Sequence, residues 1–157
     1  MEAFKIFTRN LGLSLWAYFI MSFLGVLCQY LLDVTTRVPI GTSSPQYIPW
    51  WVEIILWIHV LGSVAFYFHL GTRLKLIGSH LLNFFSVSGG LTFGTLLIIL
   101  AIYFNPYLIL FGVFSFMRFT ILLSGWLNNE FIAVAIVSVL PTIIIWLAML
   151  YKNKISA

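Results

Sequence analysis

Long apolar runs separated by short polar segments organise this chain. The three clearest runs cover residues 11–32, 50–70 and 131–151. An α-helix rises about 1.5 Å per residue, so roughly 20 apolar residues cross the hydrocarbon core of a bilayer, which is about 30 Å thick. Each of the three runs therefore predicts one membrane-spanning helix.

A fourth apolar region, residues 86–123, is too long for one crossing. As a single helix it would extend roughly 57 Å, nearly twice the thickness of the core. Pro106 lacks a backbone donor and disfavours helical geometry at Asn105, which makes this dipeptide the natural break. We expect one crossing over residues 88–105 and an interfacial or re-entrant segment over residues 107–127. The alternative is that the second half crosses back, which gives five spans.

The segment between the first two runs, residues 33–49, is polar and rich in proline. Pro39, Pro45 and Pro49 fix their backbone angles and cannot donate main-chain hydrogen bonds, so an irregular loop is predicted. Trp50 opens the next run with an amphipathic indole, a side chain that is stable at headgroup depth. We expect an extracytoplasmic loop that ends at the membrane surface.

Positive charge is unevenly distributed among the segments outside the runs. With four spans, one side of the membrane carries six basic residues: Lys5, Arg9, Arg73, Lys75, Lys152 and Lys154. The other side carries Arg37 and Arg118. Cytoplasmic loops are enriched in lysine and arginine, so this distribution predicts a plasma-membrane protein with both termini in the cytoplasm. With five spans, the C-terminal lysines change sides and Arg118 enters a span, at a cost of about 2.5 to 3.5 kcal/mol.

The composition agrees with a chain that is surrounded by lipid. Of its 157 residues, 62% are hydrophobic and only 8% are charged, whereas soluble domains carry about 25% charged residues. We therefore expect an all-α, polytopic integral membrane protein, folded as one four-helix transmembrane bundle over residues 1–157 and in contact with the lipid bilayer. The net charge of +4 fits contacts with anionic headgroups. A nucleic-acid partner is not expected, because no basic face is large enough to neutralise several phosphates.

Four ionisable residues inside or beside the runs are candidate functional groups: Glu53, His59, Arg118 and Glu130. An ionisable side chain at membrane depth is a functional hypothesis by default. His59 lies near the middle of its run, whereas the other three lie near the outer membrane surface in the four-span arrangement. A neutral imidazole bonded to a neighbouring helix is the structural interpretation of His59, and a proton or cation step is the functional one.

The sequence contains none of the common catalytic or ligand-binding motifs. There is no H-E-x-x-H, no P-loop, no G-x-S-x-G and no G-x-G-x-x-G. Cys28 is the only cysteine, which excludes an internal disulfide and a tetrathiolate metal site. We expect no catalytic, cofactor-binding or metal-binding residues and no cofactor.

Two glycines are candidate helix-packing residues. Gly90 and Gly94 form a small-x-x-x-small pattern, in which the missing side chains let two helix backbones approach closely in lipid. The contact lies either within the chain or between subunits.

These features favour a small non-enzymatic protein that acts as an accessory, regulatory or assembly subunit. Short loops and close-packing glycines point to binding of another membrane protein, or of a second copy of the chain, through the helices. Two alternatives stay open. One is a small transporter or channel subunit that uses His59 as its intramembrane polar element, and the other is a lipid-modifying membrane enzyme.

Overall fold

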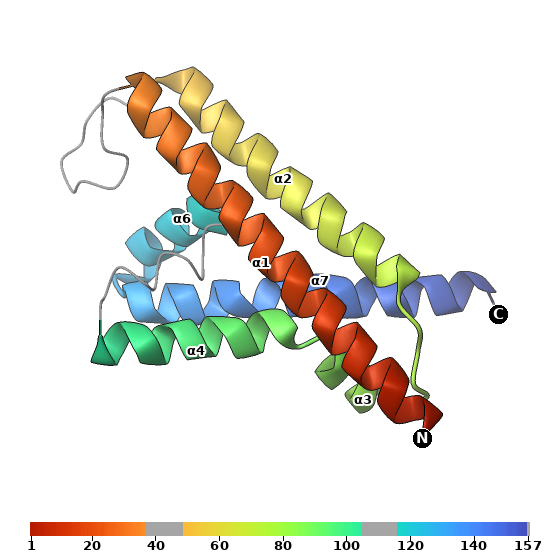
Figure 1. Ribbon diagram of the computed structural model, residues 1–157. Helices are drawn as coiled ribbons and strands as arrows, with labels where there is room; N and C mark the ends of the chain where they lie inside the picture. The colour runs from red at the N-terminus through yellow and green to blue at the C-terminus, as the bar shows by residue number, and fades with distance from the viewer. Residues whose placement is uncertain (37–48, 105–115, 157) are drawn as a thin grey trace.

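All regular structure in the computed structural model is helical within the residues that it describes, 1–36, 49–104 and 116–156 (Figure 1). Six helices follow one another along these ranges: α1 (Glu2–Thr36), α2 (Trp50–Arg73), α3 (His80–Ser86), α4 (Gly89–Tyr103), α6 (Met117–Leu127) and α7 (Glu130–Ser156). The expected all-α class is confirmed for this part of the chain.

Three helices are long and apolar enough to cross a membrane. They are residues 2–32 of α1, all of α2, and residues 132–154 of α7. These helices bear out the expected membrane character of the chain. By contrast, α4 has 15 residues, or about 22 Å along its axis, which is less than the thickness of a hydrocarbon core.

The first helix is longer than the apolar run that predicts it. α1 begins at Glu2 rather than near Leu11, because residues 2–11 contain no glycine or proline and the carboxylate of Glu2 favours the positive end of the helix dipole. α1 also continues to Thr36, so the polar segment after it begins later than expected. The remainder of that segment, residues 37–48, lies outside the described residues.

The helices observed around the expected third crossing depart further from the prediction than α1 does. A short helix, α3, precedes it, and α4 covers residues 89–103 of the expected 88–105. α4 thus ends ahead of Pro106, as the break at that proline requires. α6 forms the later part of the expected segment 107–127, and the earlier part lies outside the described residues.

α7 is the central helix of the molecule. It contacts α1, α2, α3, α4 and α6. In Figure 1, α4 lies along the N-terminal half of α7, and α2 meets α7 near its C-terminal end. Both termini lie at one end of the molecule, together with the end of α2 (Figure 1).

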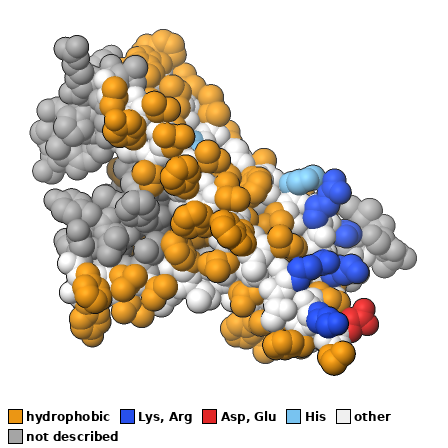
Figure 2. Space-filling model, viewed as in Figure 1, with side chains coloured by type: hydrophobic (Ala, Val, Ile, Leu, Met, Phe, Trp, Pro, Cys, Tyr) orange, Lys and Arg blue, Asp and Glu red, His pale blue; other side chains and the backbone are white. Residues whose placement is uncertain are grey.

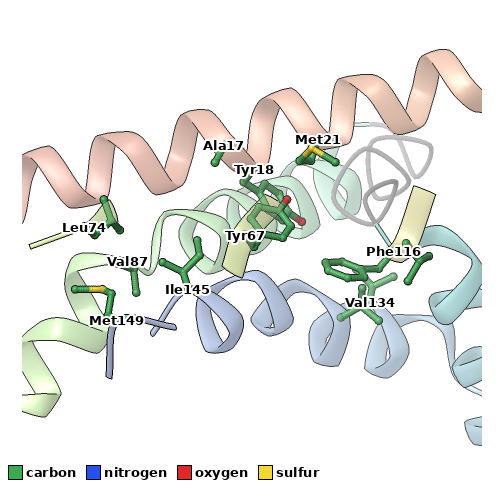
Figure 3. Packing of buried hydrophobic residues seen from close by; sticks show 12 residues of the cluster. Ala17, Tyr18, Met21, Tyr67, Leu74, Val87, Phe116, Val134, Ile145 and Met149 are labelled. Atoms are coloured by element: carbon green, nitrogen blue, oxygen red, sulfur yellow. The ribbon is translucent and has the colours of Figure 1, made fainter. Parts of the chain in front are cut away.

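The main core lies between α1, α2 and α7. Figure 3 shows Tyr18 and Met21 of α1 and Ile145 of α7 directed into it. Tyr67 of α2 stacks on Phe116, with ring centroids 6.0 Å apart. Side chains of α1 and α2, together with Phe116, therefore meet side chains of α7 in this core.

Candidate functional site

The two polar residues expected on the second run, Glu53 and His59, lie on α2 without sharing a site. They are about 240° apart around the helix axis. Glu53 is half-buried in the first turn, where the helix dipole favours a carboxylate. His59 is half-buried beside the packed face of α2, its Nε2 atom is buried, and its carbonyl accepts a 2.9 Å hydrogen bond from the hydroxyl of Ser63.

The other two candidate ionisable residues lie at the start of α6 and α7. Arg118 is the second residue of α6, and Glu130 is the first residue of α7. Asn128, in a left-handed conformation with φ 49°, ends α6 and turns the chain toward α7. The side chains of Arg118 and Glu130 lie outside the described residues.

The two candidate packing glycines lie on the face of α4 that meets α1 and α7. A Cβ atom at Gly90 would lie 3.0 Å from Cδ2 of Tyr18 and 3.4 Å from Cβ of Pro141. A Cβ atom at Gly94 would lie 2.7 Å from Oγ of Ser138. These positions have no room for an added side chain, so the closeness of α4 to its neighbours depends on glycine. Both contacts lie within one chain.

The turn between α3 and α4 is buried although its backbone is not helical. Non-helical backbone at membrane depth needs hydrogen-bond partners inside the protein. The N–H groups of Val87 and Ser88 donate to carbonyls of α3, and the N–H of Gly89 donates to Oγ of Ser14 on α1 at 3.2 Å. With these amides bonded, the helix can break inside the bundle.

Two buried asparagines hold the segment between α2 and α3. Nδ2 of Asn10 donates to the carbonyl of Lys75 at 2.8 Å, and the N–H of Ile77 donates to Oδ1 of Asn83 at 2.7 Å. This segment is therefore tied to the N-terminal part of α1. The sequence analysis missed both asparagines. Each is an amide residue next to apolar residues in the sequence. Such a residue could have indicated a buried contact, because an amide side chain that is buried needs hydrogen-bond partners.

A polar link also joins α1 to α7 at the centre of the bundle. The hydroxyl of Tyr18 and the side chain of Ser138 share a hydrogen bond beside Gly94. Ser138 also donates to the carbonyl of Val134 at 2.8 Å. These groups hold helices in register. Among the residues that the structure describes, no three His, Cys, Asp or Glu side chains are grouped so as to hold a metal ion.

The surface of α1 beside α4 carries an open apolar groove. Its volume is about 210 Å³, and it is lined by Leu15, Trp16, Phe19 and Phe93. Trp16 is 64% exposed and Phe19 is 48% exposed, and both lie in the first apolar run of the chain. Edge contacts order the rings, with centroids 6.0 Å apart for Trp16–Phe19 and 6.3 Å for Phe19–Phe93. The groove is thus walled by aromatic rings that hold one another in place.

Comparison of the chain with models of protein families, with curated proteins and with solved structures gives no match. The groove between α1 and α4 is the feature of the described surface that points most directly to a binding role.

Proposed function

We propose that this chain is an accessory, regulatory or assembly subunit that binds a transmembrane helix of another membrane protein, or of a second copy of itself, in the groove between α1 and α4. The proposal rests on the exposure of the ordered aromatic rings of Trp16 and Phe19 in the first apolar run of the chain. Lipid tails are as apolar as leucine, so helices associate in a bilayer through fit and van der Waals contact. A groove walled by rigid rings offers both.

The packing of the three long helices supports the same proposal. In their most apolar stretches, 50% of the residues of α7 are buried, against 33% for α1 and 28% for α2. α7 is therefore the most enclosed by other helices of the chain, whereas most residues of α1 and α2 are exposed to lipid or to a partner.

The arrangement of the chain supports four crossings with both termini in the cytoplasm of a plasma-membrane protein. In this proposal α1, α2 and α7 are full crossings, and α3 with α4 forms the remaining one as a broken helix. The α2–α3 connection is bonded to α1 through Asn10 and borders α7 at Lys152. The N-terminal part, this connection and the C-terminal end thus meet at one end, as an even number of crossings requires (Figure 1).

α6 fits the expected interfacial or re-entrant segment better than a fifth crossing. It has 11 residues, or about 16 Å along its axis, roughly half of a hydrocarbon core. It packs on α7 and α2 rather than standing alone.

Site-specific photocross-linking in native membranes tests the proposed binding role. A benzophenone amino acid replaces Trp16 in the groove, or, as controls, the exposed Ile58 of α2 or Leu147 of α7. We expect one protein adduct of defined mass from position 16 and only lipid adducts from the two controls. Equal protein adducts at all three positions, or lipid adducts alone at position 16, would contradict the proposal.

A matched pair of variants then measures what the groove contributes. Trp16→Ala with Phe19→Ala removes the rings, and Ile58→Ala with Leu61→Ala removes equally exposed side chains elsewhere. Truncation of central aromatic anchors costs about 2 kcal/mol or more, so recovery of the adduct partner should fall roughly 30-fold in the first variant. The second variant should retain it. Co-expression of two tagged copies shows whether the partner is the chain itself.

A transport role through His59 is the alternative that the buried Nε2 atom favours. It predicts ion or proton flux by the purified chain alone in liposomes, and loss of that flux in His59→Ala. Absence of flux from the chain alone, together with the cross-link at position 16, supports the subunit role.

A further inference from the structure

Basic side chains gather at the end of the molecule where both termini lie. The six lysines and arginines whose side chains the structure describes are all exposed: Lys5, Arg9, Arg73, Lys75, Lys152 and Lys154. Figure 2 shows Lys and Arg side chains concentrated at this end, while hydrophobic side chains cover most of the remaining described surface in that view. The positive charge is thus contributed by three separate parts of the chain.

A cavity lies within this basic end. It has a volume of about 350 Å³ and is lined by Leu74, Lys75 and Leu76 from the α2–α3 connection and by Lys152 and Asn153 from α7. Two lysines and an asparagine therefore line the same space from two sides. Leu76, which is half-buried, supplies an apolar surface.

The walls of this cavity are fixed by the fold. The carbonyl of Lys75 accepts the 2.8 Å hydrogen bond from Asn10, and Leu74 is buried, with its N–H donating to the carbonyl of Gly71 at 3.2 Å. Gly71 in turn packs directly on the backbone of Ile145 of α7. The connection is thereby tied to α1 and α7, so the two lysine backbones are positioned before any ligand arrives.

α3 places this end at the membrane surface. It buries its polar residues Asn83 and Ser86 and exposes Leu81, Leu82 and Phe85, at 67%, 47% and 49%. In water this pattern would be inverted, because exposed faces of short helices are normally polar. An apolar outer face that begins beside a basic cluster is typical of the end of a membrane crossing, where acyl chains meet headgroups.

We propose that the cavity between residues 74–76 and the C-terminal end of α7 binds the phosphate of an anionic phospholipid headgroup. Lys75 and Lys152 neutralise the phosphate, and the amide of Asn153 donates to a headgroup oxygen. The half-buried Leu76 faces the apolar part of the same lipid. Basic pockets between membrane helices on the cytoplasmic side are suited to such headgroups, since lysine near an anionic surface is attracted to it.

Compensation of helix dipoles does not account for this arrangement. A lysine in the last turn of a helix stabilises the negative end of its dipole. Lys75, however, lies beyond the end of α2, after Leu74 in extended conformation. Its position is set by the bond from Asn10 rather than by the helix end.

Lipid binding to the full-length protein in mild detergent, measured by native mass spectrometry, tests the proposal. The probes are phosphatidylglycerol and phosphatidylcholine of the same chain length. Lys75→Gln with Lys152→Gln removes the two cavity charges, and Lys5→Gln with Lys154→Gln removes two charges of the same basic end outside the cavity. We expect the wild type to prefer phosphatidylglycerol. The first variant should bind phosphatidylglycerol about 30-fold more weakly than the wild type, at roughly one kcal/mol for each lysine. The second variant should bind it less than about twofold more weakly.

Inorganic phosphate and glycerol 3-phosphate distinguish a lipid from a soluble phosphate. Neither should displace phosphatidylglycerol at millimolar concentration, because both lack the apolar part that contacts Leu76. Displacement by inorganic phosphate alone would overturn the assignment of the ligand as a lipid. Equal losses in the two variants, or equal binding of the two lipids to the wild type, would overturn the site itself. If the variant with both cavity lysines replaced does not fold, the comparison of phosphatidylglycerol with phosphatidylcholine on the wild type still tests the proposal, and equal binding overturns it.

Discussion

Two helix contacts in this molecule are built from different kinds of side chain. In the central contact, residues 89–94 of α4 lie against α1 and α7, and its main members are small or polar: Ser14, Tyr18, Gly89, Gly90, Gly94 and Ser138. In the outer contact, α1 meets α2 through aliphatic side chains and a thiol: Cys28, Leu32, Val52 and Leu56. The central contact is close and hydrogen-bonded, whereas the outer contact is a small aliphatic cluster.

The difference follows from the surroundings. In water, the aliphatic cluster would be the stronger contact, because burial of apolar surface stabilises it. In a bilayer, lipid tails replace such contacts at little cost, so stability depends on close fit and on polar groups that lipid cannot satisfy. We therefore expect the central contact to hold the bundle together and the outer contact to be dispensable.

The largest effect is expected from Gly89→Ala. A Cβ atom there would lie 2.5 Å from the backbone nitrogen of Leu15 and 2.6 Å from Oγ of Ser14. Backbone cannot rotate away as a side chain can, so α4 must shift and the bond from Gly89 to Ser14 is lost. We expect destabilisation of about 3 kcal/mol or more, measured by reversible unfolding in mixed micelles.

Gly62→Ala is the matched control. Gly62 is also helical, and a Cβ there has no atom within 4 Å. This change should leave stability unchanged or raise it by about 0.5 to 1 kcal/mol, because alanine loses less backbone entropy than glycine. Equal destabilisation by the two substitutions would show that the central contact is not specially close.

A somewhat smaller effect is expected from Gly90→Leu. The nearest atoms to the new Cβ belong to the side chains of Tyr18 and Pro141, at 3.0 and 3.4 Å, and Tyr18 can yield by changing its rotamer. Overpacking of this kind costs about 1 to 3 kcal/mol. Leucine at the open position Gly62 serves as the comparison, and thermal denaturation followed by fluorescence-detected size exclusion measures both.

The sequence predicts the long helices well because length and apolarity are local properties. The runs at 11–32, 50–70 and 131–151 each correspond to one long helix. It does not predict α3, a helix of seven residues that lies almost entirely between two of the apolar runs. The hydroxyl of Ser79 caps the start of α3 by accepting a hydrogen bond from the N–H of Leu82 at 3.2 Å. The side chain of Asn83, within α3, is buried.

The binding features are harder to predict because they are made by residues far apart in the sequence. The pattern Gly90-x-x-x-Gly94 specifies a close approach but not the partner, which here includes Tyr18 of α1. The groove joins Trp16 to Phe93, and the basic cavity joins Lys75 to Lys152. Helical periodicity cannot reveal pairs that come from different helices.

An intermediate effect is expected from Tyr18→Phe, which removes one hydroxyl from the central contact. The ring remains in place, so the change isolates the hydrogen bond to Ser138. Interhelical bonds of this kind contribute about 0.6 kcal/mol on average and at most about 1.7. A double-mutant cycle with Ser138→Ala measures the coupling. Additive effects of the two substitutions would contradict a direct bond.

The smallest effect is expected from Leu56→Ala in the outer contact. Leu56 is buried against α1 in a small cluster, and neighbouring apolar residues such as Leu31 and Ile55 are exposed. Lipid can occupy the vacated space, so we expect a loss of no more than about 0.5 kcal/mol in a bilayer. Steric trapping of the unfolded state in bicelles measures this difference. A loss as large as that from Gly90→Leu would reverse the proposed ranking of the two contacts.

Cysteine labelling tests whether the basic end, with both termini, faces the cytoplasm after four crossings. On a Cys28→Ser background, single cysteines replace Ser79, Asn153 or Asn129, which are all exposed. A membrane-impermeant maleimide applied to intact cells should label position 129 only, and should label positions 79 and 153 after permeabilisation. Labelling of position 153 in intact cells would contradict the account.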